Sequence, residues 1–476
     1  MVRRTRIAAL LTLAMINVFT LAAGVVVVRM LPARLAALRV PSVAAGQLDG
    51  AGTVLATGTE RGALPTAAGL RSALAGPLST AALGPRVSAL VADPVTGQVL
   101  LSEQGDRLST PASTAKLATS VAALAVLGAN ARFTTRVVRG ATPDSIILVG
   151  GGDPTLAVNA FPARDYPRPA TLAQLAEATA RALKAQGRQS VSVGYDTSLY
   201  TGPALAPGWP QSYVSTGNVT PIVSLEVDQG RLTTAGVPED SDDPYNLGPR
   251  ATDPAAMAAA SFAALLASDG VRVSGSPAAQ TAPGHAAVLA SVSSPPLSAI
   301  VEQMLLESNN VIAENLARQV AVAAGRPASF SGAAAAVISE LRRLGVAAGI
   351  HLVDGSGLSP QDAIAPATLV KVLELATADP ALRALLAGLP VAGFSGTLSA
   401  GQSVFAGISG AALGSVRAKT GNLGTVTALA GTVDDKNGTM LVFAFMADQI
   451  PSSGMLGEAA NAIDEAAAAL AGCGCR

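Results

Sequence analysis

Apolar positions recur along the chain with two different periods, and each period predicts one type of element. Runs with an apolar residue every three or four positions predict helices at about 63–82, 110–127, 172–186, 254–268, 297–344 and 457–470. Short apolar runs bounded by Gly, Pro and Asp predict strands at 86–91, 98–102, 133–138, 145–149, 190–193, 223–227, 416–433 and 439–447. Turn residues at 93–97 and 434–438 separate neighbouring strands and predict hairpins there.

The pattern changes between residues 133 and 288, where short strand-like runs alternate with loops and two helices. We interpret 133–288 as an inserted smaller α+β domain, and 63–132 together with 289–476 as the domain that carries it. Residues 31–62 are rich in Ala, Gly and Thr without a sustained period, which predicts a linker.

An uncharged apolar stretch, residues 7–28, follows Arg3, Arg4 and Arg6. At about 1.5 Å per residue this stretch spans roughly 33 Å, the thickness of one bilayer core. A cleaved signal peptide has a shorter apolar run and a small-residue cleavage site, so the sequence favours a transmembrane signal anchor at 1–30 over a cleaved signal. The arginines predict a cytoplasmic N-terminus, with the remaining chain extracytoplasmic, or secreted if the segment is cleaved.

Composition narrows the classes of function. Of the 476 residues 50% are hydrophobic but only 3% aromatic, which predicts a large core of Ala, Leu and Val. The formal net charge of +0 argues against a nucleic-acid partner. Cys473 and Cys475 lie at the C-terminus, without the Cys/His spacing of a zinc site. We expect them to form a free tail, the alternatives being a pair with each other or with a partner.

Lysine is rare here, with 5 lysines against 27 arginines among the 32 basic residues. A desolvated ammonium can lose its proton and act as a base, whereas a guanidinium stays charged. Lys116 follows Ser113 by three residues in a predicted helix, so the two side chains can meet. His285 and His351 are interpreted as structural, which leaves a Ser-His-Asp triad poorly supported. The alternative for Ser113 and Lys116 is an ordinary surface pair.

Two further triplets extend this pair. Ser308-Asn309-Asn310 lies between helical stretches, where a hydroxyl could relay a proton and an amide could hold both lysine and substrate. Lys419-Thr420-Gly421 lies in a predicted strand, where an ammonium and a hydroxyl could bind a carboxylate beside a glycine that admits substrate backbone. Each triplet alone is also compatible with a helix cap or an ordinary sheet edge. Their order together predicts a serine acyl-transfer site.

The combination resembles the low-molecular-mass class C penicillin-binding proteins, the D-alanyl-D-alanine carboxypeptidase/endopeptidase family. The wide gap between Ser113 and Ser308 resembles this family too, because its members insert domain material there. The supporting strings are Pro111-Ala112-Ser113-Thr114-Ala115-Lys116, Gly150-Gly151-Gly152-Asp153-Pro154-Thr155-Leu156, Asp354-Gly355-Ser356-Gly357-Leu358-Ser359 and the strand 425–431.

The resemblance implies an α/β fold, a serine β-lactamase/transpeptidase-like domain whose antiparallel sheet has helices on both sides. It implies a serine D,D-peptidase without cofactor or metal, whose partners are peptidoglycan stem peptides and β-lactam antibiotics. Ser113 would be the acylated nucleophile and Lys116 its base. Ser308 would pass the proton to the departing D-alanine. Residues implied in substrate binding are Asn310, Lys419, Thr420, Gly421 and Asn422, with the N–H groups of Ser113 and Asn422 as the oxyanion hole.

Three positions qualify this assignment. Pro360 stands where members of the family often have Arg, which puts a guanidinium contact to the substrate side chain in doubt. Asn422 replaces a frequent Ser or Thr, so side-chain contacts would differ while the backbone donor is retained. Asp153 would either lie near the cleft and meet an amino group of the stem peptide, or cap the turn before Pro154.

Two rival functions follow from the same residues. A β-lactamase would need fast deacylation, and no glutamate stands out in the sequence as the base that activates water. A wall-binding or penicillin-sensing module with an idle site would not need the complete set of Ser, Lys and Asn side chains. We therefore expect a D-alanyl-D-alanine carboxypeptidase, with endopeptidase action open.

Overall fold

The computed structural model describes residues 62–160, 166–232, 248–346, 348–400, 405 and 410–475. The predicted anchor at 1–30 and most of the predicted linker lie outside these residues. Over the ranges described, no helix combines the length and apolar character needed to cross a bilayer.

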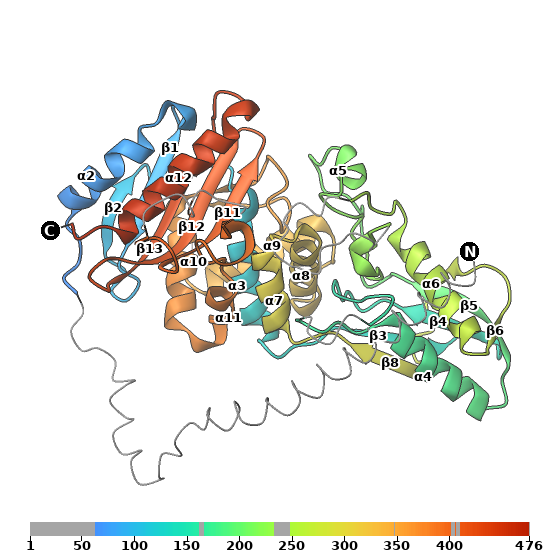
Figure 1. The fold of residues 1–476 in the computed structure, drawn as a ribbon. Helices are drawn as coiled ribbons and strands as arrows, with labels where there is room; N and C mark the ends of the chain where they lie inside the picture. The colour runs from blue at the N-terminus through green and yellow to red at the C-terminus, as the bar shows by residue number, and fades with distance from the viewer. Residues whose placement is uncertain are drawn as a thin grey trace, which may run out of the picture. The chain divides into compact units, whose positions relative to one another are not determined.

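A five-stranded antiparallel sheet forms the first layer of the fold, with the spatial order β11-β12-β13-β1-β2 (Figure 1). Its strands are β1 Val87–Ala92, β2 Val99–Glu103, β11 Val416–Leu423, β12 Val426–Asp434 and β13 Met440–Ala447. The first described strand, β1, pairs with the last, β13, and Val91 faces Phe443. The single strand predicted at 416–433 is wrong in one respect, because Gly424, with a φ of 59°, turns the chain between β11 and β12.

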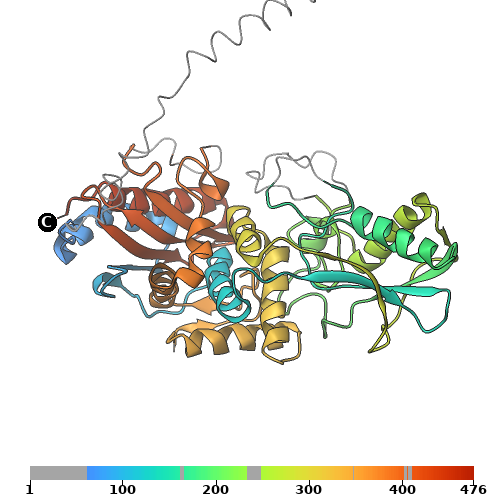
Figure 2. The same ribbon diagram turned by 90° about the horizontal axis from the view of Figure 1, so that it is seen from below.

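Successive side chains along each strand point to opposite faces of this sheet, and each face is covered by different helices. In β12, Leu429 and Val433 pack with α2 and α12 on one face. Ala428 and Ala430 lie on the other face, in the cluster that contains α3 and α10. This period of two is typical of a strand buried on both faces. Figure 2 shows the sheet between its helical layers. The helices around it are α2 Ala67–Leu78, α3 Ala115–Leu127, α7 Leu297–Leu306, α8 Asn310–Ala323, α9 Phe330–Arg343, α10 Pro366–Ala378, α11 Ala384–Ala387 and α12 Leu456–Ala471.

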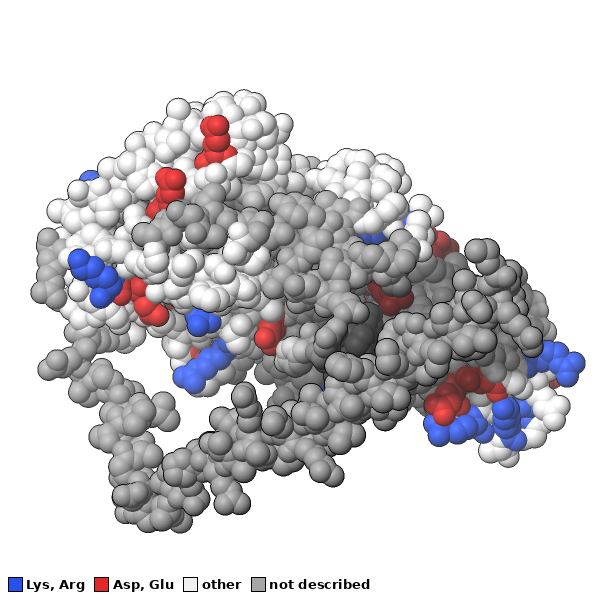
Figure 3. Space-filling view, viewed as in Figure 1, with Lys and Arg blue, Asp and Glu red and all other residues white. Residues whose placement is uncertain are grey.

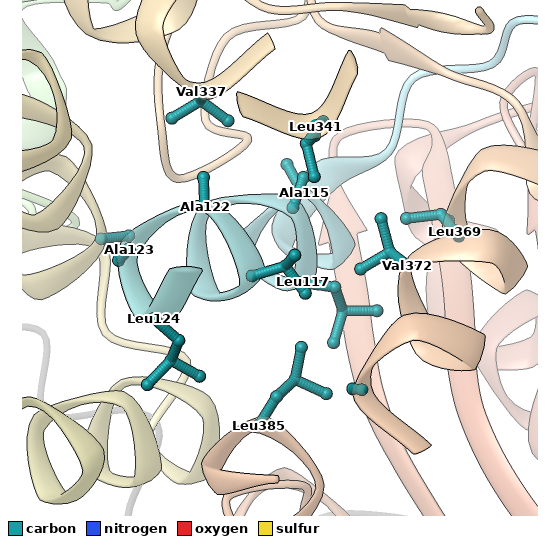
Figure 4. Packing of buried hydrophobic residues seen from close by; sticks show 14 of the residues in the cluster. Ala115, Leu117, Ala122, Ala123, Leu124, Val337, Leu341, Leu369, Val372 and Leu385 are labelled. Atoms are coloured by element: carbon teal, nitrogen blue, oxygen red, sulfur yellow. The ribbon is translucent and has the colours of Figure 1, made fainter. Parts of the chain in front are cut away.

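Helix α3 lies inside the larger core. All its residues from Ala115 to Leu124 are buried, and Figure 4 shows Leu117 and Ala122 among side chains of α9, α10 and α11. Alanines at many α3 positions let the neighbouring helices approach closely. A polar side chain on this helix is therefore desolvated wherever it points.

A second, mixed sheet is built from residues 134–293, with the order β6-β5-β4-β3-β8 and β7 beside β5. Its strands are β3 Thr134–Arg139, β4 Ser145–Val149, β5 Ser190–Asp196, β6 Arg272–Val273, β7 Ala278–Ala279 and β8 Val288–Ser293. Helices α4 Leu172–Ala185 and α6 Pro254–Ser268 pack on this sheet, whereas the short α5 Ser212–Ser215 packs beside Trp209 and Phe330. Residues 62–476 group as one compact unit, so the predicted domain boundaries stay a prediction.

The strand predicted at 223–227 is wrong. The chain runs there without strand pairing into a left-handed turn, Asp228–Gly230. Leu225 and Val227 are buried in the core of the second sheet, which accounts for the strand-like pattern of apolar residues. Consecutive positive φ angles at the turn are incompatible with a continuing strand.

The prediction of a free C-terminal tail is also wrong. Cys473 and Cys475 form a disulfide with a Cα–Cα distance of 5.1 Å. The Cys475 carbonyl accepts a hydrogen bond from the N–H of Thr66 at 2.9 Å, and Cys475 packs against Gly69 of α2. The C-terminus is thereby attached to the first described helix.

A small two-stranded sheet, β9 Ile350–His351 with β10 Ala363–Ile364, contains one of the two histidines. On the surface, the charged side chains visible in Figure 3 are of both signs and lie interspersed on that face.

Candidate active site

Ser113 lies in a single 3₁₀ turn, Ala112–Thr114, that leads directly into α3. Ala112 is buried and has a φ of 45°, an unfavourable value for a residue with a Cβ. The Ala112 carbonyl packs so closely on Gly357 that no side chain fits at position 357. Unfavourable backbone geometry of this kind persists where its surroundings enforce it, and it is concentrated at functional sites. The turn leaves Ser113 partly exposed.

Lys116 is fully buried, one turn of backbone after Ser113. Its Nζ donates hydrogen bonds to Ser113 Oγ at 2.8 Å, to Asn310 Oδ1 at 2.6 Å and to the Ser356 carbonyl at 2.9 Å. Three acceptors use all three donors of an ammonium group. The predicted contact between Ser113 and Lys116 is thus present in the structure.

Burial lowers the pKa of Lys116 from 10.5 to about 7, against the opposing effect of the nearby Asp354 and Glu314 carboxylates. A lysine with this pKa is neutral in a substantial fraction of molecules near neutral pH. Its Nζ can then accept a proton from Ser113 Oγ, which it already contacts.

The Ser308-Asn309-Asn310 triplet forms the junction between α7 and α8. Ser308 has a φ of 54°, the second unfavourable backbone angle at the site. Asn309 caps α8 by accepting a hydrogen bond from Ile312 N–H at 3.1 Å. Asn310, the first residue of α8, donates from Nδ2 to the Asn218 carbonyl at 2.9 Å while its Oδ1 accepts from Lys116. Asn310 therefore lies against Lys116, as the sequence predicts.

Lys419 on β11 is fully buried. Its Nζ contacts the carbonyl of Thr420 at 2.9 Å and Thr420 Oγ1 at 3.4 Å, and Thr420 Oγ1 donates to Thr397 Oγ1 at 2.9 Å. Burial and then the charge of Lys116 hold the pKa of Lys419 well below its usual value. A bound anion would counter both effects, so the site favours a negatively charged ligand.

The structure gives a reason for glycine at position 421 in addition to the predicted space for substrate backbone. A Cβ at this position would lie 2.6 Å from the Pro111 carbonyl oxygen and 3.2 Å from the nitrogen of Thr114. Glycine therefore allows β11 to lie directly against the turn that carries Ser113. Asn422 directs its Oδ1 into the sheet, where it accepts from Thr427 Oγ1 at 2.8 Å.

The third acceptor of Lys116, the Ser356 carbonyl, lies in a loop held by two carboxylates, Glu314 and Asp354, to which the sequence assigned no role. Glu314 accepts from Gly355 N–H at 3.0 Å and from Ser356 N–H at 2.8 Å. Asp354 accepts from Gly357 N–H and Ser359 N–H, both at 2.7 Å, and from Trp209 Nε1 at 2.8 Å. These bonds fix the loop whose Ser356 carbonyl meets Lys116. Burial is the main cause that raises the pKa of Glu314, and the negative charge of Asp354 is the next largest.

A signal for Glu314 was available in the sequence. Glu314 follows Asn310 by four residues, so both project from the same face of α8. No comparable local signal points to Trp209, which reaches Asp354 from a distant part of the chain.

Asp153 is buried, and its Oδ1 accepts from Thr155 N–H at 2.9 Å and from Thr155 Oγ1 at 2.6 Å. Burial raises its pKa to about 6. The preceding Gly151 carbonyl is bound by Gln319 Nε2 at 2.8 Å, and Gln319 lies about 13 Å along α8 from Asn310. Asp153 caps its own turn, as one of the two alternatives predicts, and no contact of Asp153 with Ser113 or Lys116 occurs among its hydrogen bonds in the described structure.

Within the described residues, no three or more His, Cys, Asp or Glu side chains are grouped so as to hold a metal ion. Ser113, Lys116, Asn310 and Ser356 are instead joined through one ammonium group. The geometry is that of an acyl-transfer site with a lysine base.

Comparisons with known proteins identify the family of this chain. The model of the D-Ala-D-Ala carboxypeptidase 3 (S13) family matches residues 70–244 and 231–470. Carboxypeptidase DacB of Mycolicibacterium smegmatis is 38% identical over 418 residues, 86% of this chain and 85% of the relative. A carboxypeptidase of Mycobacterium tuberculosis is 38% identical over 447 residues, 92% of this chain and 89% of the relative.

Among solved structures, penicillin-binding protein 4 of Haemophilus influenzae has the same fold, with a TM-score of 0.65 and 24% identity over 80% of this chain and 93% of that one. Its complex with a β-lactam matches with a TM-score of 0.59 and 26% identity, at the same coverage. These matches confirm the predicted transpeptidase-like fold. The chain belongs to the D-Ala-D-Ala carboxypeptidase 3 (S13) family.

Proposed function

We propose that this serine D-Ala-D-Ala carboxypeptidase cleaves peptidoglycan stem peptides through an acyl-enzyme on Ser113. The observation that carries the assignment of roles is the 2.8 Å contact between Lys116 Nζ and Ser113 Oγ, together with a pKa of about 7 for Lys116. A serine hydroxyl needs an adjacent base to become a nucleophile, and this base is in place before substrate binds.

In the acylation step, Ser113 Oγ attacks the carbonyl carbon of the penultimate D-alanine while its proton moves to neutral Lys116 Nζ. The N–H groups of Ser113 and Asn422 stabilise the oxyanion. The C–N bond then breaks, and the proton passes through the Ser308 hydroxyl to the amine of the departing D-alanine. In deacylation, water attacks the ester carbon and gives its proton to Lys116; the bond between this carbon and Ser113 Oγ then breaks, and Lys116 returns the proton to Ser113 Oγ.

Lys419 and Thr420 bind the terminal carboxylate of the substrate. Buried Lys419 lacks a carboxylate partner among its described hydrogen bonds, which go to the Thr420 carbonyl and hydroxyl. A substrate carboxylate would complete the ion pair, and the bound anion would favour the charged form of the lysine. This arrangement selects peptides that end in a free D-alanine carboxylate.

β-Lactams acylate Ser113 in the same way in this proposal. The similarity to a penicillin-binding protein 4 that was solved with a β-lactam supports it. Glu314 and Asp354, the carboxylates that act on the pKa of Lys116, are already engaged by backbone N–H groups. Neither is free to serve, in addition to Lys116, as a dedicated base for water, which favours a long-lived adduct over β-lactamase turnover.

We also propose where in the cell this protein lies. The apolar residues 7–28, preceded by three arginines, anchor the chain in the cell membrane with the catalytic residues on the extracytoplasmic side. Peptidoglycan stem peptides are the substrates available on that side.

Labelling with a fluorescent penicillin tests the nucleophile. Ser113→Ala should abolish covalent labelling, whereas Ser72→Ala, at an exposed serine of α2, should label at the wild-type rate. Labelling of Ser113→Ala at the wild-type rate would sink the assignment. Mass spectrometry of products from monomeric and cross-linked muropeptides then separates carboxypeptidase from endopeptidase action.

A further inference from the structure

Residues 214–232 contact the triplet Ser308-Asn309-Asn310 at two separate points. The Asn218 carbonyl accepts a hydrogen bond from Asn310 Nδ2 at 2.9 Å. Gln229 Oε1 accepts one from Asn309 Nδ2 at 2.8 Å, in a buried environment. These residues belong to the segment inserted between Ser113 and Ser308, so the insert reaches both asparagines of the triplet.

Arg250 joins the two contact points. Its Nε donates to the Gly217 carbonyl at 3.2 Å, beside Asn218, and its Nη1 donates to the Gln229 carbonyl at 3.2 Å. Arg250 is only 7% exposed. One rigid guanidinium group therefore fixes the distance between the segment that meets Asn310 and the turn that meets Asn309.

The turn at 228–230 has an unfavourable backbone conformation. Asp228 and Gln229 have φ angles of 49° and 55°, values that residues with a Cβ rarely adopt. Arg231 Nη1 donates to Gln229 Oε1 at 2.9 Å and thereby orients the amide oxygen toward Asn309. Ser308, on the other side of this contact, is left-handed as well. Two unfavourable turns thus meet through one buried hydrogen bond.

We propose that Gln229 is a positioning residue for catalysis, through which the inserted segment holds Ser308-Asn309-Asn310 in its reactive arrangement. This inference rests on the proposed function. The bond that Asn309 Nδ2 donates to Gln229 fixes Asn309, which caps α8, and so fixes the adjacent Asn310, whose Oδ1 lies 2.6 Å from Lys116 Nζ. Loss of this bond would let the triplet move relative to Lys116, and misplacement by about 1 Å can cost roughly 100-fold in rate.

The test compares two substitutions at position 229 in the full-length chain. Gln229→Met keeps the volume but removes the acceptor, whereas Gln229→Glu keeps an acceptor beside Arg231. Gln186→Met is the matched control, because Gln186 Oε1 also accepts from an arginine, Arg139, but on the exposed surface of the insert. The second-order rate of acylation by a fluorescent penicillin is measured from pH 5 to 9, normalised to the fraction of protein that can be labelled.

We expect Gln229→Met to lower the plateau rate by about 10- to 100-fold and to shift the acid limb of the profile to lower pH. The shift follows because Asn310 Oδ1 favours the charged form of Lys116, while Asp354, Glu314 and Lys419 around it are unchanged. Gln229→Glu should stay within about 3-fold of wild type, and Gln186→Met should equal it.

A wild-type rate and profile in Gln229→Met overturns the inference, and so does an equal loss in Gln229→Glu. A role in folding alone would lower the labelled fraction without moving the normalised rate or the acid limb, which also overturns it. If Gln229→Met does not fold, the same normalised rate and pH profile are measured for Arg250→Lys, which keeps the charge but loses the bridge between the two carbonyls. A wild-type rate and profile in Arg250→Lys would then overturn the inference. Absence of labelling at Ser113 in the wild type would instead refute the proposed function.

Discussion

Lys116 and Lys419 are both fully buried, yet the proposed reaction needs opposite charge states from them. Lys116 must be neutral to accept the proton of Ser113, and its lowered pKa provides this without a ligand. Lys419 must be charged to hold a carboxylate, although burial and Lys116 lower its pKa as well. The substrate anion would resolve this conflict, because it stabilises the ammonium form of Lys419.

Acylation by penicillin should accelerate as the pH rises through about 7, because Lys116 then loses its proton. Lys116→Arg should lower the rate by about 10²- to 10⁴-fold at every pH, since a guanidinium cannot act as a base. Lys184→Arg, a change at an exposed lysine bound to a backbone carbonyl, is the control. A Lys116→Arg variant with wild-type kinetics would contradict a lysine base.

The same pKa shift has a consequence for stability. Between pH 7 and 10.5 the unfolded chain holds a proton on Lys116 that the folded chain has lost. The contribution of this group to the free energy of unfolding therefore rises with pH across that window. The lysine destabilises the fold most where it is forced to stay charged, below pH 7.

At the scale of elements, α8 and β11 place most of the site. Asn310 and Glu314 lie one turn apart on α8, one contacting Lys116 and the other holding the loop whose carbonyl contacts Lys116. β11 carries Lys419 and approaches the Ser113 turn at Gly421. The spacing between the proposed nucleophile Ser113 and the proposed carboxylate-binding residues Lys419 and Thr420 thus depends on the close packing of a strand on a turn.

Gly421→Ala tests this packing. Its Cβ would lie 2.6 Å from the Pro111 carbonyl, so β11 or the turn must move, and we expect acylation to slow by roughly 10- to 100-fold. Gly457→Ala is the control, because a Cβ there meets nothing within 4 Å. Stopped-flow labelling measures the rates. Equal rates in the two variants would show that the close approach does not matter for catalysis.

At the scale of the whole molecule, residues 62–476 form one compact unit, although their described part contains two large sheets and the small β9–β10 sheet. Trp209 donates a hydrogen bond to Asp354, and Asn218 and Gln229 accept hydrogen bonds from Asn310 and Asn309. The chain between Ser113 and Ser308 therefore contacts both the 354–359 loop and the triplet. The insert is thus part of the structural support of the active site.

The proposed anchor gives a prediction at this scale. Full-length protein expressed in a bacterial host should remain in the membrane fraction after an alkaline wash, because residues 7–28 are long and apolar enough to span a bilayer. A chain that starts at Gly62 should be found in the soluble fraction and still label with penicillin. If the full-length chain is expressed but the recovered protein is soluble and has lost residues 1–30, this result would support the cleaved-signal alternative instead.

Local sequence determined much of this protein. Apolar periodicity located α4, α6 and β4 nearly residue by residue, because long amphipathic or bounded runs have few other ways to bury their side chains. The spacing of Ser113 and Lys116 placed both on one helical turn. The order of the three triplets was enough to predict the family.

Tertiary structure decided the rest, since it depends on contacts between distant residues. The run 223–227 is strand-like in pattern, yet its side chains are buried in the core without strand pairing and a left-handed turn follows. Burial of α3 on all sides, which lowers the pKa of Lys116, comes from helices far away in the chain. Trp209 and Gln229 approach the site only through the packing of the insert, and no local pattern of apolar or polar residues encodes such contacts.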